Sequence, residues 1–168
     1  KEVIIPDGSF VLQEGDKISF IASQKDSSEF FQKVGIVNNN VKSIMIVGGG
    51  RLTFYLAKLL KDTKIKIKII EQDLDRCTEL SELLPSAMII HGDGSDQQLL
   101  LEEGISQAEA FASLTGFDEE NIMLSLYAAS KSRAKLITKV NRISFEEVID
   151  SLNLGSIIYP KLITADSI

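Results

Sequence analysis

Residues 44–53, which read IMIVGGGRLT, decide the fold of this 168-residue chain. The four apolar residues Ile44 to Val47 predict a buried strand, and three glycines follow them directly. Leucines then recur at helical spacing, at Leu52, Leu56, Leu59 and Leu60. A strand that passes through glycines into an amphipathic helix is the opening unit of a nucleotide-binding βαβ fold.

Further strand-sized apolar runs follow at 65–70, 88–90, 111–114, 136–140 and 157–159. Their spacing leaves room for one helix between each pair, which is typical of a parallel sheet with crossover helices. We therefore predict an α/β fold over residues 42–168, a Rossmann-like, doubly wound, parallel six-stranded sheet. Lysines 64, 66 and 68 alternate with isoleucines in the second strand, so either one face is incompletely covered or the lysine stems reach past a thin helix layer.

The first 35 residues have a different pattern. Short β-like runs at 3–5, 10–12 and 18–21 are separated by turn residues, and a brief helix is expected at 29–34, ended by Gly35. A piece this small buries too little apolar surface to stand alone. We predict that residues 1–35 are the C-terminal fragment of a small β-rich domain and that residues 36–41 form a linker.

Composition excludes several classes of function. A net charge of −6 gives no general attraction to nucleic acid or anionic lipid. No apolar run approaches the roughly 20 residues that cross a bilayer, and the chain does not start with a secretion signal, so a cytoplasmic location is expected. The single cysteine, Cys77, and the single histidine, His91, are interpreted as structural residues, and we predict no metal site.

The glycine turn is the predicted phosphate-binding element. Gly48 permits a tight turn, and Gly50 removes a Cβ so that backbone amides at the start of the helix, through Leu52, can approach a diphosphate. Arg51 either bridges the phosphates or remains a solvated surface residue. Thr53 replaces the usual small residue of this fingerprint, which predicts a slightly wider gap between helix and strand.

Glu71 ends the second predicted strand, roughly 20 residues after the glycines, where a carboxylate accepts hydrogen bonds from both ribose hydroxyls of adenosine. A carboxylate repels a 2′-phosphate, so NAD or NADH is favoured over NADP(H), and ADP or ATP satisfies the same contacts. The sequence therefore has a strand, a glycine turn, a helix and an acid in the order and at the spacing of a nucleotide-binding fold. Together they predict a nucleotide site.

Two later strand ends reach the same edge of the predicted sheet. Asp93 and Gly94 follow the third strand, where Asp93 either faces the adenine or only forms a turn before a helix expected to be capped by Ser95. Thr115 follows the fourth strand and, with Gly116, is a candidate to line the nucleotide. The acids at 118–120 are interpreted as offsetting the dipole of a helix.

Four of these motifs, Ile46–Arg51, Ile69–Glu71, His91–Asp96 and Asp118–Leu124, together resemble the regulatory TrkA subunits of Trk-type potassium uptake systems. The resemblance spans nearly the whole chain and implies the fold known as the regulator of potassium conductance domain. It implies that residues 1–35 end the small β-rich domain that precedes the second Rossmann half in tandem members.

The resemblance also implies a function. It describes a cytoplasmic subunit, peripheral to the inner face of the membrane, that forms a homo-oligomer, a dimer or larger ring, beneath a potassium-translocating membrane protein and changes its gating when nucleotide binds. By the same resemblance, phosphates are held by Gly48, Gly50 and Arg51, ribose by Glu71, and Asp93 with Thr115 lies near the adenosine.

The main alternative is a fragment of an NAD-dependent oxidoreductase, because the same fold and fingerprint serve hydride transfer. A dehydrogenase generally supplies an acid or base near neutral pKa, a Tyr–Lys pair or a metal. The predicted site offers none of these, so we expect a sensor and not an enzyme. A pure oligomerisation module with a vestigial glycine turn is the third possibility.

Overall fold

The computed structural model describes residues 8–11, 13–15, 22–35, 41–142, 149, 151–152 and 154–160. The chain divides into two compact units, Lys1–Asn40 and Val41–Ile168. In the first unit, α1 (Gln24–Lys33) is N-capped by the Ser23 hydroxyl, which accepts a hydrogen bond from the amide of Asp26. The predicted brief helix is thus present, but it begins earlier, at Gln24.

The β-rich assignment of residues 1–35 stays a prediction. The runs at 3–5 and 18–21 lie outside the described residues, and so do residues 36–40 of the predicted linker. Within the run at 10–12, Phe10 and Val11 are described and belong to no strand.

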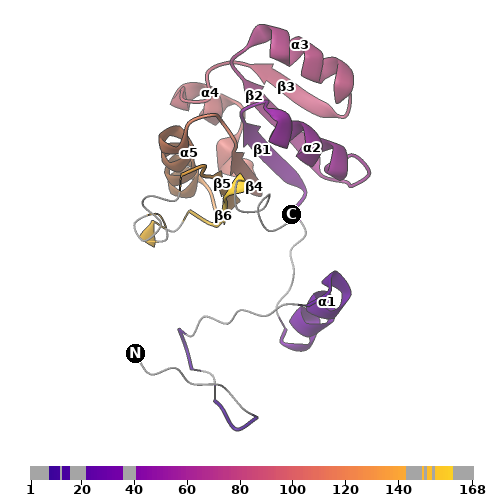
Figure 1. Cartoon of the computed structure of the whole chain (residues 1–168), viewed down its shortest axis with the longest axis vertical. Coiled ribbons are helices and arrows are strands. Elements are labelled where there is room, and N and C mark those ends of the chain that lie inside the picture. The colour runs from indigo at the N-terminus through magenta and orange to yellow at the C-terminus, as the bar shows by residue number, and fades with distance from the viewer. Residues whose placement is uncertain are drawn as a thin grey trace. The chain divides into compact units, whose positions relative to one another are not determined.

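The second unit contains the sheet. Its strands are β1 (Ser43–Val47), β2 (Lys66–Glu71), β3 (Ala87–His91), β4 (Ala110–Ser113), β5 (Lys135–Lys139) and β6 (Ser156–Ile158). All pairs are parallel, in the order β3-β2-β1-β4-β5-β6. Each strand lies within one residue of its predicted bounds, so the predicted six-stranded Rossmann-like fold is confirmed (Figure 1).

Helices cover both faces of this sheet (Figure 1). They are α2 (Arg51–Leu60), α3 (Leu74–Leu83), α4 (Gln97–Glu102), the 3₁₀ turn η1 (Ile105–Gln107) and α5 (Asp118–Lys131). On one face, Leu80 of α3 packs with Ile46 and Ile69, and all three are fully buried. On the other face, Leu100 of α4 belongs to the same core cluster as Phe111. Because successive side chains of a strand point to opposite faces, the strands contribute apolar residues to the cores on both faces of the sheet.

The lysines of β2 lie on the face that α4 and η1 cover only partly. Ile67 and Ile69 are buried on the α2–α3 face, whereas Lys66 is exposed. Lys68 is half-buried and donates from Nζ to the carboxylate of Glu103 at 2.8 Å and to its carbonyl at 2.7 Å. Incomplete cover of one face, the first of the two explanations, accounts for the alternation.

Helix starts within the second unit fall into two kinds. α3 is capped by Asp73 and α4 by Asp96, whose carboxylates accept from amides of their own first turns. The prediction that Ser95 caps α4 is wrong, because Asp96 takes that position and Ser95 bonds to Asp93 instead. The caps of α2 and α5, Gly50 and Phe117, make no side-chain cap bond. No helix among the described residues is both long and apolar enough to span a bilayer.

Candidate functional site

A cavity of about 270 Å³ opens at the carboxyl edge of the sheet. We call it the edge cavity; its lining residues are Val47, Gly48, Gly49, Gly50, Ile70, Glu71, Gln72, Gly94, Leu114, Thr115, Gly116, Phe117, Glu120 and Lys139. It spans the ends of β1, β2, β4 and β5 and includes the point where the strand order reverses. Ligands of open α/β sheets bind at this position.

Gly48 is required by the closeness of β1 to β4. Its φ is +99°, and a Cβ built there would lie 2.9 Å from the backbone of Leu114 and Thr115. Its amide donates to the carbonyl of Ile70 at 2.9 Å. The first glycine of the fingerprint therefore serves the fold itself, because it allows the chain to leave β1 between two neighbouring strands.

Gly50 is different, because nothing in the protein lies within 4 Å of the position of its missing Cβ. It is the N-cap of α2, with an ordinary φ of −68° and no side-chain cap. Within the described residues, no acceptor is recorded for the amides of Arg51 and Leu52 in the first turn of α2. Open space beside unpaired amides at a helix N-terminus fits a diphosphate.

Glu71 lies against the same turn. Its Oε2 accepts from the amide of Gly49 at 2.6 Å and its Oε1 from the amide of Asp73 at 2.8 Å. A carboxylate has about four lone-pair sites, so two remain for a pair of ribose hydroxyls. The residues present therefore fit an adenosine diphosphate group, with α2 amides for its phosphates and Glu71 for its ribose.

Two side chains hold the carbonyls of the turn. Thr53 is fully buried, and its hydroxyl donates to the carbonyl of Gly48. Arg76, in the first turn of α3, donates from Nε to the carbonyl of Gly49 at 2.7 Å and from Nη1 to Glu79 at 2.6 Å. Because these bonds fix the carbonyls, the neighbouring amides are oriented before any ligand arrives. Sequence spacing carried no signal for Arg76.

Asp93 forms a turn at the end of β3. Its Oδ1 accepts from both the amide and the hydroxyl of Ser95 at 2.8 Å, and these bonds lower the pKa of its carboxyl. It is exposed and is not among the residues that line the edge cavity. Its neighbour Gly94 does line the cavity, where a Cβ would overlap the side chain of Val47. His91 is exposed and bonds the carbonyl of Gln72.

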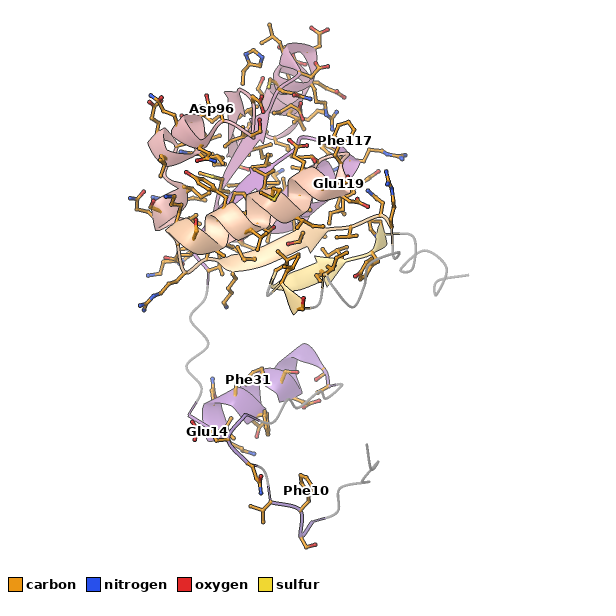
Figure 2. The ribbon with its side chains drawn as sticks, turned by 90° about the vertical axis from the view of Figure 1, so that its left-hand side faces the viewer. Phe10, Glu14, Phe31, Asp96, Phe117 and Glu119 are labelled. Atoms are coloured by element: carbon orange, nitrogen blue, oxygen red, sulfur yellow. The ribbon has the colours of Figure 1, made fainter. Side chains whose placement is uncertain are left out.

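The opposite end of the cavity is built on Thr115. Its amide donates to the buried side chain of Asn121 at 2.8 Å, and its carbonyl accepts from Nζ of Lys139 at 2.8 Å. Its hydroxyl lies 2.9 Å from Oε2 of Glu120. Phe117, whose side chain is 67% exposed, stands beside them at the start of α5 (Figure 2).

The structure thus brings six predicted site residues together around the edge cavity and leaves three outside its lining. The six are Gly48, Gly50, Glu71, Gly94, Thr115 and Gly116. The three are Arg51, Leu52 and Asp93, of which the first two contribute the first turn of α2. The lining residues that the sequence did not single out as ligand contacts are Val47, Gly49, Ile70, Gln72, Leu114, Phe117, Glu120 and Lys139.

Residues 44–160 match the family model described as the TrkA-N domain. The chain belongs to the TrkA-N domain family. Curated relatives include the Trk system potassium uptake protein TrkA of Haemophilus influenzae, 33% identical over 165 residues, and that of Halomonas elongata, 32% identical over 165 residues. These matches cover 98% of this chain and 36% of each relative, so the chain spans about a third of the proteins it matches.

Solved structures share the TrkA-N fold. The TrkA-N domain of the inner membrane protein ybaL from Escherichia coli superposes with a TM-score of 0.67 at 16% identity, over 77% of this chain and 95% of that one. The GsuK channel bound to NAD gives a TM-score of 0.61 at 18% identity, over 73% of this chain and 22% of that one. At these identities the likeness concerns the fold alone.

Proposed function

We propose that this TrkA-N domain is the nucleotide-sensing part of a regulatory subunit that controls a potassium uptake system in the membrane. Membership of the family and the naming of its relatives as potassium uptake proteins support the regulatory role. The partner is then a potassium-translocating membrane protein, with the domain on its cytoplasmic side as part of a homo-oligomer.

The observation that carries the ligand assignment is the pairing of Glu71 with the uncapped start of α2 across one turn. The ligand class is an adenine nucleotide, NAD or NADH first, with ADP or ATP able to make the same contacts. The glycine turn and first turn of α2, through Gly50, Arg51 and Leu52, hold the diphosphate. Gly94 and Thr115 border the adenosine half, and Asp93 is the candidate beyond them.

Regulation follows if nucleotide binds two assembled states with different affinity, because a ligand shifts an equilibrium only by that difference. The bound nucleotide acts as an effector, and no bond in it is broken. The described residues place neither His91 nor a tyrosine in the edge cavity.

The direct test is thermal denaturation with NAD, NADH, ADP and ATP, together with mass spectrometry of any nucleotide that copurifies. A ligand at one hundred times its dissociation constant stabilises the folded state by about 2.7 kcal/mol. A melting temperature unmoved by all four at saturation would end the sensor proposal. Oxidation of NADH with turnover of a substrate would favour the oxidoreductase fragment instead.

A further inference from the structure

The helices α2 and α3 cover the same face of the sheet (Figure 1). α2 turns Thr53 and Ala57 toward the sheet, so Tyr55, Lys58 and Leu59 lie on its outer side. Tyr55 is 60% exposed and Leu59 is 79% exposed. No residue of α2 is acidic. The outer side of this helix is therefore apolar and basic.

α3 has the opposite charge. It turns Cys77 and Leu80 toward the sheet, so its outer side carries three carboxylates flanked by two leucines. The carboxylates are those of Asp75, Glu79 and Glu82, and the exposed leucines are Leu74 and Leu83. Glu79 pairs with Arg76 of the same helix, but no ion pair within the described residues involves Asp75 or Glu82. The outer side of α3 is therefore apolar and acidic.

We call these two outer sides together the outer helix face. Exposed apolar side chains that gather among charges are typical of protein interfaces. A basic and apolar helix beside an acidic and apolar helix makes a face that is complementary to itself. A two-fold axis parallel to the helices places α2 of each copy on α3 of the other, because the rotation exchanges their positions and keeps their direction.

This arrangement brings matching residues together. Both helices follow strands of a parallel sheet, so both run from the carboxyl edge toward the amino edge. The end of α2 therefore meets the end of α3 in the second copy. Leu59 then packs against Leu83 of the other copy, and Lys58 lies near its Glu82, twice in each pair of copies.

Charge also favours a second copy over other occupants. A net charge of −6 makes two copies repel each other in general, so they associate only where opposite charges are paired locally. A partner surface of one sign, such as an anionic membrane, would attract α2 and repel α3. The same chain in a two-fold arrangement satisfies both helices.

We propose that the outer helix face is a two-fold interface between copies of this chain. The inference rests on the homo-oligomer of the proposed function and assigns a surface to it, whereas the nucleotide site plays no part in it. Each helix has ten residues and is about 15 Å long, so the face is smaller than the roughly 800 Å² per partner of a standard interface. We therefore expect weak association, with a dissociation constant in the micromolar range.

Sedimentation velocity on the full chain, at concentrations up to about 200 µM, measures this association. Leu59→Ser removes an exposed apolar contact twice from the pair and should raise the dissociation constant by about tenfold or more. Met88→Ser is the matched control, because Met88 is 56% exposed in β3 and lies on the opposite face of the sheet. It should associate as the wild-type chain does.

A charge exchange tests the pairing of the two helices. Lys58→Glu and Glu82→Lys each bring like charges together, so each variant by itself should lose most of its association. In an equimolar mixture, the two reversed charges face each other in one half of the interface and Lys58 faces Glu82 in the other half. Association of the mixture should return to within about threefold of the wild-type value.

Three results would overturn the interface. They are a wild-type chain that stays monomeric at the highest concentration, self-association that Leu59→Ser and both charge reversals leave unchanged, and reversed variants that do not associate when mixed. A monomeric chain would assign the outer helix face to a different partner. The melting temperature with NADH separates this inference from the proposed function, because Leu59 lies outside the edge cavity and Leu59→Ser should keep the full NADH response.

Discussion

The carboxylate of Glu71 accepts a hydrogen bond of 2.6 Å from the amide of Gly49, so the acid at the end of β2 and the glycine turn after β1 form one unit. The bond joins residues 22 positions apart. It orients the carboxylate toward the turn, because the amide donates to one lone pair of the carboxylate oxygen. The two elements of the fingerprint are therefore positioned relative to each other before nucleotide arrives.

Glu71→Ala should affect both stability and binding. It removes the acceptor for the amides of Gly49 and Asp73, which costs about 1–3 kcal/mol of unfolding free energy. It also removes the proposed ribose contact, so the rise in melting temperature with saturating NADH should be mostly lost. Urea denaturation and thermal shift measure the two effects separately.

Glu109→Ala is the matched control for Glu71→Ala. Its Oε2 accepts from the amide of Lys42 at 2.7 Å, but it lies outside the edge cavity. This variant should lose some stability and keep its full response to NADH. An NADH response that survives in Glu71→Ala would show that the carboxylate does not hold the ribose.

The two outer glycines of the turn should behave in opposite ways. Gly48→Ala places a Cβ at a φ of +99° and 2.9 Å from the backbone of Leu114, so we expect a loss of about 1–3 kcal/mol in the absence of ligand. Gly50→Ala meets nothing within 4 Å, so its cost in stability should stay below about 1 kcal/mol.

The affinity for nucleotide should further distinguish Gly50→Ala from Gly48→Ala. The new methyl group of Gly50→Ala enters the space assigned to the diphosphate, so the dissociation constant for NADH should rise at least tenfold. Calorimetry on the folded variant measures this rise. Unchanged NADH affinity in Gly50→Ala would place the diphosphate elsewhere.

Most of this fold was predictable because it depends on periodicity. Strand-sized apolar runs separated by helix-sized ones fix six parallel strands, and the glycines followed by Glu71 fix the edge that carries the site. The strict alternation of β2 was also informative, because Lys68 lies where α4 is too short to cover the sheet. Such features depend on residues close in sequence.

The remaining contacts depend on residues that the fold brings together. Nothing in the spacing places Arg76 on the carbonyl of Gly49, 27 positions away, or Lys139 on the carbonyl of Thr115, 24 positions away. The cap of α4 was missed because Ser95 and Asp96 are adjacent and both are good caps, so sequence rules do not choose between them. Asp96 prevails because the Asp93 turn engages Ser95.

Asp118 should matter far more than its place in a first helical turn suggests. It is 8% exposed and accepts three hydrogen bonds, from the amides of Asn141 and Arg142 and from the side chain of Asn141. Asp118→Ala leaves these donors without their acceptor, and we expect it to cost about 1–3 kcal/mol in urea denaturation. Glu119→Ala, an exposed neighbour, should change stability by less than about 0.5 kcal/mol. If the two substitutions cost the same free energy of unfolding, Asp118 only offsets the dipole of α5.

Cys77 provides a probe of the end of β2, where Glu71 lies, because it is the single cysteine of the chain. Its side chain is 7% exposed, and its Sγ donates to the carbonyl of Glu71 at 3.3 Å. Burial first, and then the negative charges of Glu71 and Asp73, raise the pKa of the thiol. Only the thiolate reacts with alkylating reagents, so labelling at pH 7.5 should be at least tenfold slower in the folded chain than in urea.

The raised pKa of Cys77 also links stability to alkaline pH. The folded chain keeps the proton to a higher pH than the unfolded chain, so this contribution to stability is complete below the ordinary thiol pKa of about 8.5. It is lost as pH rises from there through the raised value, because the unfolded state ionises first. Cys77→Ala should therefore lose less stability between pH 8 and pH 10 than the wild-type chain does. Parallel urea titrations measure this difference, and identical alkaline slopes would contradict a raised thiol pKa.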